Sequence, residues 1–174
     1  MRYCPFYCEE NIFHLSREPA LRARPREVVF ISNEHHCCAV WHQRAASRAT
    51  WPILWDYHVV LLAGAPWEVW DLDTTLGVPV PASDYLRRTF RAGVPDDLLP
   101  CFRVVEAEAF ASVFSSDRRH MRLANGRWKS KPPPWPPIGS PGAEPNLMRF
   151  VDVTSPFLGE VLDLAGMRAH LSDA

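Results

Sequence analysis

Apolar residues fall in short runs along the chain, and their spacing predicts β-strands more often than helices. The runs EVVFIS (Glu27–Ser32) and CAVWHQ (Cys38–Gln43) alternate or stay apolar, as strands do. HVVLL (His58–Leu62) and WEVWDL (Trp67–Leu72) are separated by AGAP, and a Gly and a Pro between two strand-like runs indicate a hairpin. FRVVEAEAF (Phe102–Phe110) fits either a strand or a strand that passes into a helix.

Two segments near the ends of the chain have the pattern of helices. Glu9–Arg17 begins with two acidic residues, carries apolar residues on one face and is followed by Pro19. This prediction places Cys8 at the start of a helix, with Arg17–Arg26 as the connection to the first strand. Val161–His170 is predicted as the last helix.

The composition changes between residues 125 and 145, where NGRWKSKPPPWPPIGSPGAEP is rich in Pro and Gly. Its PPPWPP core favours extended polyproline II structure. We expect an ordered loop within the domain, anchored by Trp135, because the apolar sequence LMRFVDV that follows returns to the fold.

These elements predict an α/β protein of the α+β type, with a central, largely antiparallel sheet flanked by helices. A chain of 174 residues with 47% hydrophobic content is sized for one domain, here residues 1–174.

Charge and apolar length exclude several classes of partner. The formal net charge is −1, which provides no basic surface for nucleic acid. No apolar run is long enough to cross a bilayer, and MRYCPFYCEEN does not resemble a signal peptide, so we expect a soluble, intracellular protein. We further expect it to act as a monomer, in the cytoplasm and also in the nucleus. The odd set of 5 cysteines indicates free thiols.

The stretch WDYHVVLL (Trp55–Leu62) raises a chemical question, because a strand that is apolar on both faces begins with an acid and an imidazole. If the hairpin turns at AGAP, Leu62 pairs with Trp67 and His58 pairs with Asp71. Side chains in such pairs lie about 4.5–5.5 Å apart at Cβ, within hydrogen-bonding reach. A carboxylate there would fix the histidine tautomer and leave its other nitrogen basic. A register slip of one residue would turn Asp71 to the opposite face.

Cys8 is the nucleophile that best suits such a base. Unpaired N–H groups and the dipole at a helix N-terminus favour a thiolate, and the same N–H groups can hold an oxyanion. Cys8, His58 and Asp71 therefore form a candidate thiol triad. Buried, purely structural roles for the cysteine and the histidine remain the alternative.

Other readings of the same residues remain open. A structural zinc site could be drawn from Cys4, Cys8, His42 and HHCC (His35–Cys38), but neighbouring strand residues face opposite sides and no C-x-x-C occurs. A cysteine protease or a transamidase would use the same triad. KPPPWPP also offers a PxxP pattern, typical of ligands of SH3-like domains.

Six motifs give the chain a strong resemblance to the protein N-terminal glutamine amidohydrolase family. They occur in the family's order over most of residues 3–151: YCEENIF, VFISNE, WDYHVVLL, DLDT, SDRRHM and PPPWPP. The resemblance implies a fold related to papain-like and transglutaminase-like thiol hydrolases. It also implies a catalytic triad of Cys8, His58 and Asp71.

The implied reaction converts an N-terminal glutamine of a protein or peptide to glutamate and releases ammonia, as a step of the N-degron pathway. It proceeds through an acyl-thioester and needs neither a metal nor an organic cofactor. Selection of a terminal residue requires an acceptor for the free α-ammonium group, for which the candidates are Asp117, Glu9 and Asn33. Trp55 and Tyr57 are candidates for the pocket walls.

Overall fold

A six-stranded sheet with the order β6-β5-β4-β1-β7-β8 forms the centre of the molecule, and all its neighbouring strands are antiparallel. The computed structural model describes residues 2–139 and 142–172. The strands of this sheet are β1 (Arg26–Ser32), β4 (His58–Ala63), β5 (Glu68–Trp70), β6 (Val80–Pro81), β7 (Cys101–Glu106) and β8 (Glu160–Leu162). A separate pair is formed by β2 (Cys38–Val40) and β3 (Ile53–Trp55).

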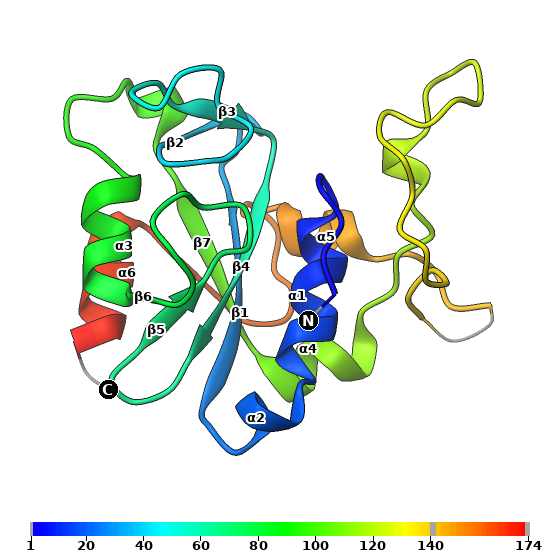
Figure 1. Cartoon of the computed structure of the whole chain (residues 1–174), viewed down its shortest axis with the longest axis horizontal. Helices are drawn as coiled ribbons and strands as arrows, with labels where there is room; N and C mark the ends of the chain where they lie inside the picture. The colour runs from blue at the N-terminus through cyan, green and yellow to red at the C-terminus, as the bar shows by residue number, and fades with distance from the viewer. Residues whose placement is uncertain (1, 140–141, 173–174) are drawn as a thin grey trace.

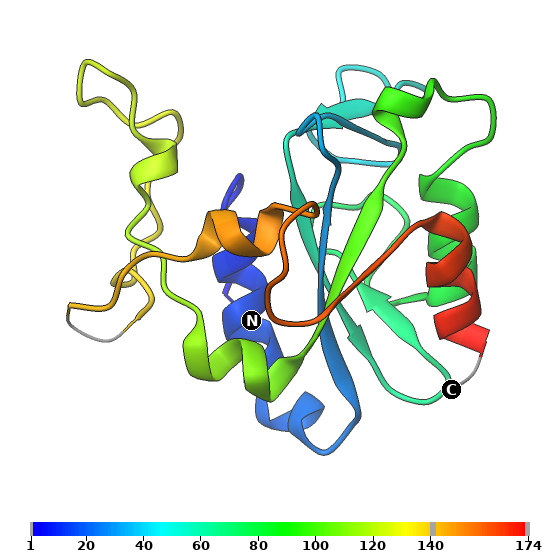
Figure 2. The ribbon, with the colours of Figure 1, turned by 180° about the vertical axis from the view of Figure 1, so that it is seen from behind.

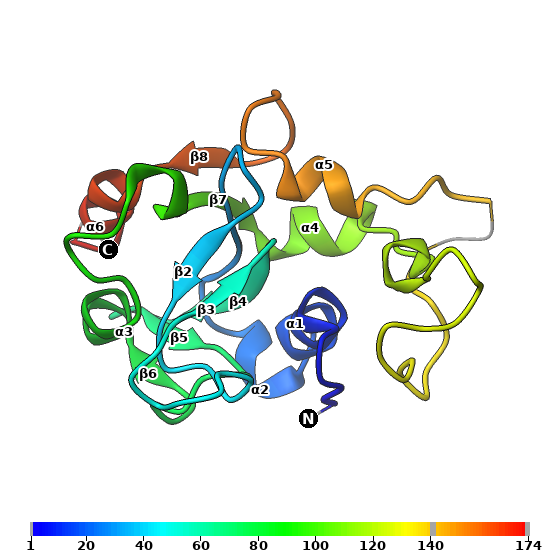
Figure 3. The ribbon, with the colours of Figure 1, turned by 90° about the horizontal axis from the view of Figure 1, so that it is seen from above.

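Helices cover both faces of the sheet (Figures 1 and 3). One face carries α1 (Cys8–Ser16), α4 (Ala107–Val113) and α5 (Leu147–Val151), and the other carries α3 (Ala82–Thr89) and α6 (Leu164–Ser172). The short helix α2 (Pro19–Arg22) lies between α1 and β1, and two 3₁₀ turns occupy Asp96–Leu98 and Arg119–Met121. None of the described helices is both long and apolar enough to cross a bilayer.

The two-sided covering explains why the middle of β1, and β4 after His58, are apolar on both faces. Successive strand residues point to opposite faces, so Val28 and Phe30 enter the core beneath α1, α4 and α5. Val29 and Ile31 enter the second core, beneath α3 and α6. The prediction of an antiparallel α+β fold flanked by helices is thus confirmed.

Several expected elements differ from the structure in extent. The predicted strand Cys38–Gln43 ends at Val40 and belongs to the small sheet, and the connection Arg17–Arg26 contains α2, with Pro19 in its first turn. The predicted helix Val161–His170 begins as strand β8, because Val161 pairs with Arg103 before the chain turns into α6.

The segment between α4 and α5 leaves the layered body and extends beyond α1 (Figure 2). Its proline-rich part, residues 131–137, contains no regular secondary structure. Trp135 nevertheless contacts α1, since its Nε1 donates a hydrogen bond to Glu10 at 2.7 Å.

Candidate active site

His58, the first residue of β4, is joined to a buried carboxylate. Its Nε2 lies 2.9 Å from Oδ1 of Asp71, which follows β5, and the two side chains are 2% and 0% exposed. The hairpin register differs from the predicted one, because Leu62 pairs with Val69 rather than with Trp67. The shift is of two residues, so His58 and Asp71 stay on the same face and meet diagonally rather than as a direct pair.

Three further groups hold the Asp71 carboxylate. Gln43 Nε2 and the Tyr85 hydroxyl donate to Oδ2 at 2.9 and 2.8 Å, and the backbone N–H of Asp73 donates to Oδ1 at 2.9 Å. Burial alone would raise the pKa of Asp71, but the charge of His58 and these hydrogen bonds lower it below its ordinary value. Asp71 is therefore a fixed anion with both oxygens occupied.

The same pairing sets the charge state of His58. Burial alone would lower its pKa, but the charge and hydrogen bond of Asp71, with the charge of Asp73, raise it above the ordinary value. Because Nε2 is committed to Asp71, Nδ1 is the ring nitrogen left for chemistry. The indole of Trp55 stacks on the imidazole at a centroid distance of 5.9 Å and an angle of 12°.

Cys8 opens α1, which packs against β4. A helix N-terminus favours the thiolate, but the surroundings of Cys8 favour the protonated thiol. Burial raises the pKa of Cys8 well above the ordinary value, and the charges of Glu9 and Asp73 raise it further. The backbone N–H of Val59 acts in the opposite direction. The free protein thus holds Cys8 as a neutral thiol.

Cys8 and His58 line one cavity of about 510 Å³. Its apolar walls come from segments far apart in the sequence, namely Phe6, Trp55, Met121 and Met148. Its polar lining consists of Asp56, Tyr57, Asp73, His120, Lys129 and Ser130. The volume is that of a small-molecule site, large enough for one amino-acid residue and part of its neighbour.

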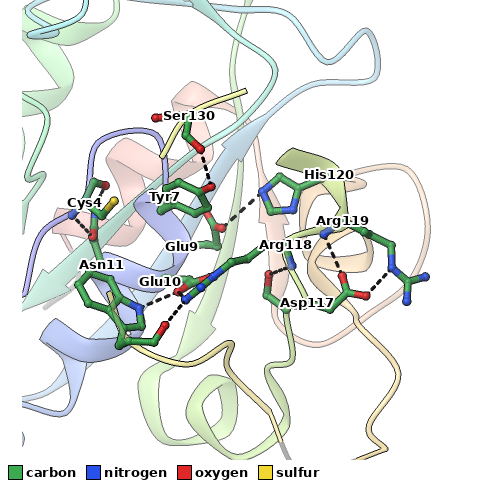
Figure 4. Close-up of polar contacts among 12 residues, drawn as sticks. Cys4, Tyr7, Glu9, Glu10, Asn11, Asp117, Arg118, Arg119, His120 and Ser130 are labelled. Carbon is green, nitrogen blue, oxygen red and sulfur yellow. Dashed lines mark hydrogen bonds and ion pairs between the residues drawn. The ribbon is translucent and has the colours of Figure 1, made fainter. Parts of the chain in front are cut away.

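Glu9 lies next to Cys8 but is not part of the cavity wall. Its carboxylate accepts hydrogen bonds from the Tyr57 hydroxyl at 3.1 Å and from the Cys8 thiol at 3.8 Å. It also lies 3.6 Å from His120 Nε2 (Figure 4). Oε1 is buried and has no hydrogen-bond partner among the described residues. Burial, followed by the charge of Glu10, raises the pKa of Glu9 to about 7.

A second buried acid, Glu10, connects α1 to the extended segment. Arg118 binds both of its oxygens, at 2.7 and 2.8 Å (Figure 4). It also donates to the carbonyl of Trp135 at 2.8 Å. This contact fixes the part of the segment that carries His120 and Met121 into the cavity.

The profile of the N-terminal glutamine amidase family matches residues 3–171. The chain belongs to this family. A protein N-terminal glutamine amidohydrolase of Arabidopsis thaliana is 34% identical over 185 residues, covering 98% of this chain and 84% of the relative. Relatives with the same name from Drosophila melanogaster and Drosophila ananassae are 40% identical over 148 residues, covering 78% of this chain and 71% of each relative.

In this member of the N-terminal glutamine amidase family, the cavity contains some of the predicted substrate residues and not others. Trp55 and Tyr57 line it, and Glu9 lies behind Tyr57. Asn33 does not line it, because its side chain binds loop backbone, including the carbonyls of Cys37 and Asp97. Asp117 does not line it either, since its carboxylate is 41% exposed and pairs with Arg119.

Several polar residues of the site were not singled out from the sequence, among them Lys129 and Ser130. Asp73 belongs to the DLDT motif and His120 to SDRRHM, so the family motifs could have indicated both. Gln43 and Tyr85 lie 28 and 14 positions from Asp71, and no local pattern marks them. An isolated bridge between Gln43 and Thr74, together with helix α3, brings them to the carboxylate.

One group of three side chains among the described residues could hold a metal ion, namely His58, Asp71 and Asp73. Their ligand atoms lie within 4.8 Å of one another. Two of these three groups are already bonded to each other. The zinc set drawn from Cys4, Cys8, His42 and His35–Cys38 forms no such group in residues 2–139 and 142–172.

Proposed function

We propose that the cavity is the active site of an amidohydrolase that converts the N-terminal glutamine of a protein or peptide to glutamate. The single observation that carries the proposal is the shared cavity of Cys8 and His58, with His58 held at 2.9 Å by the buried Asp71. Membership in the N-terminal glutamine amidase family supports the substrate, and the names of the relatives agree with it.

In this proposal, Nδ1 of His58 takes the proton of the Cys8 thiol as sulfur attacks the side-chain carboxamide carbon. A neutral thiol with a raised pKa needs such a base, because too little thiolate exists without it. Backbone N–H groups at the start of α1 hold the oxyanion in this proposal, which is supported by the lack of a side-chain cap at this end of the helix. One such donor typically contributes about 3 kcal/mol to lowering the barrier.

The tetrahedral intermediate collapses when His58 gives its proton to the departing nitrogen. The carbon–nitrogen bond breaks, ammonia leaves and an acyl-thioester remains on Cys8. Water then attacks the thioester while the same imidazole takes its proton, and the carbon–sulfur bond breaks to release glutamate and the thiol. Asp71 orients the imidazole and stabilises its cationic form in both halves. A Cys at a helix start facing a His on a strand is the arrangement of papain-like and transglutaminase-like enzymes, which supports that kinship.

The reaction has consequences for the substrate protein. An N-terminal glutamate is a substrate for arginylation in the N-degron pathway. The proposal therefore includes a role in this pathway, with the enzyme acting in the cytoplasm and the nucleus.

The test is ammonia release from three peptides of one composition: one beginning with Gln, its N-acetylated form, and one with Gln at an internal position. We expect release from the first peptide only, and mass spectrometry should show that the peptide stays intact with Glu at its first position. Equal turnover of all three peptides would reject recognition of the terminus. Cleavage of a peptide bond would instead favour the protease alternative.

A further inference from the structure

The carboxylates near the proposed catalytic residues differ in their freedom to bind a cation. Asp71 is fully buried and both its oxygens already accept hydrogen bonds. Glu9 is also fully buried, and it lies outside the cavity wall. The carboxylates that line the cavity itself are Asp56 and Asp73.

Asp56 and Asp73 have different surroundings. Asp56 is exposed, and its Oδ1 accepts a hydrogen bond from the backbone N–H of Tyr57, so water satisfies most of its charge. Asp73 is partly buried, and its Oδ1 accepts a hydrogen bond from the neutral hydroxyl of Tyr3 at 2.6 Å. Within residues 2–139 and 142–172, no Lys, Arg or His side chain forms an ion pair with Asp73. Burial raises the pKa of Asp73, and the charge of His58, the Tyr3 hydrogen bond and the charge of Arg44 offset this rise only in part.

The turn after β5 directs Asp73 toward the reacting groups. The same backbone N–H that fixes Asp71 belongs to Asp73. An oxygen of Asp73 lies within 4.8 Å of a ring nitrogen of His58. In a glutamine residue, four bonds separate the carboxamide carbon from the α-nitrogen, a span of about 5 Å at most. A carboxamide next to His58 therefore brings the α-nitrogen within reach of Asp73.

We propose that Asp73, held by the Tyr3 hydroxyl, binds the free α-ammonium group of the substrate and thereby restricts the enzyme to N-terminal glutamine. The inference rests on the proposed function. An internal glutamine has a neutral peptide N–H in place of the α-ammonium group, so the Asp73 carboxylate would have no substrate cation to bind. The residues that precede an internal glutamine would also have to fit into the cavity.

The experiment compares a Gln-first peptide with its desamino analogue, in which hydrogen replaces the α-amino group. For the wild-type enzyme, kcat/KM should favour the amine strongly, mainly through KM. In Asp73→Asn this preference should fall on the order of 30-fold, because one charged partner of an ion pair is lost. Asn keeps the acceptor for the Tyr3 hydroxyl, so the fold should be retained.

Asp56→Asn is the matched control, since it neutralises the other cavity carboxylate and keeps an acceptor for the backbone N–H of Tyr57. Its preference for the amine over the desamino analogue should stay at the wild-type value. The Asp73 assignment is overturned if Asp73→Asn keeps the wild-type ratio, or if the ratio collapses in Asp56→Asn or Glu9→Gln instead. Equal wild-type turnover of the amine and its desamino analogue would also overturn it while leaving the amidohydrolase chemistry intact. No wild-type turnover of the Gln-first peptide would reject the proposed function itself.

Discussion

At the scale of single residues, the site contains two buried carboxyl groups whose pKa values are shifted in opposite directions. Asp71 accepts four hydrogen bonds, one of them from His58, and its pKa is lowered, whereas Glu9 accepts hydrogen bonds from the Tyr57 hydroxyl and the Cys8 thiol and its pKa is raised to about 7. Both carboxylates are fully buried, so their partners decide the difference: the charge of His58 lowers the pKa of Asp71, whereas the charge of Glu10 raises the pKa of Glu9 further. The lowered pKa of Asp71 and the raised pKa of Glu9 lead to separate, measurable predictions.

Asp71→Asn should reduce kcat/KM for a Gln-first peptide by a factor on the order of 10³ to 10⁴, because the amide no longer selects the tautomer or stabilises the imidazolium. Asp71 raises the pKa of His58, and in the proposed mechanism the neutral imidazole is the base. The variant should therefore shift the acidic limb of the pH–rate profile to lower pH. Asp84→Asn, an exposed control on α3, should leave rate and profile unchanged. An unshifted limb in Asp71→Asn would show that the two residues are not coupled.

Glu9→Gln should change how stability depends on pH. A carboxyl group whose pKa rises from 4.5 to about 7 on folding favours the folded state most at pH below 4.5. That contribution is lost as pH rises toward 7 and beyond, by on the order of 3 kcal/mol. Urea unfolding at pH 5 and pH 8 should show the variant gaining stability relative to wild type at the higher pH. A difference that does not vary with pH would contradict the raised pKa.

At the scale of secondary-structure elements, the sequence predicted what local patterns control. The helix at Cys8, strands β1 and β4, and the antiparallel hairpin follow from apolar periodicity and from Gly and Pro at the turn. The exact register did not follow, because it depends on how the whole turn folds; Gly64, with φ of 100°, adopts a conformation open to glycine. The face of His58 was predictable all the same, since a shift of two residues preserves it.

The link between α1 and the extended segment was not predictable from the sequence. Glu10 and Arg118 are 108 positions apart, and an acid in the first turn of a helix is ordinarily solvated rather than fully buried. The extended segment supplies Arg118, whose ion pair with Glu10 allows this acid to lie in the interior.

Arg118→Met should destabilise the fold by about 3–5 kcal/mol, because it leaves the Glu10 charge buried without a cation. The double variant with Glu10→Gln should recover most of that loss. Arg119→Met is the matched neighbour: its pair with Asp117 is exposed, and its removal should cost less than about 1 kcal/mol. Denaturant unfolding measures all three variants. Equal losses in Arg118→Met and Arg119→Met would mean that the buried pair does not hold the segment.

At the scale of the whole molecule, the cavity joins segments that lie far apart in the chain. Helix α1 supplies Cys8, strand β4 supplies His58, and the extended segment supplies His120 and Lys129. Sequence reasoning could select the first two, because their chemistry is carried by local motifs. It could not outline the cavity, whose far wall depends on the long-range Glu10–Arg118 contact.

The most direct test of the account is ammonia release from a Gln-first peptide by Cys8→Ala, compared with Cys4→Ala. Both variants remove a free thiol from the same end of the chain, and the half-buried Cys4 lies outside the cavity lining. The account predicts no release above the uncatalysed rate from Cys8→Ala and near wild-type release from Cys4→Ala, with both proteins folded by circular dichroism. Wild-type turnover by Cys8→Ala would contradict it.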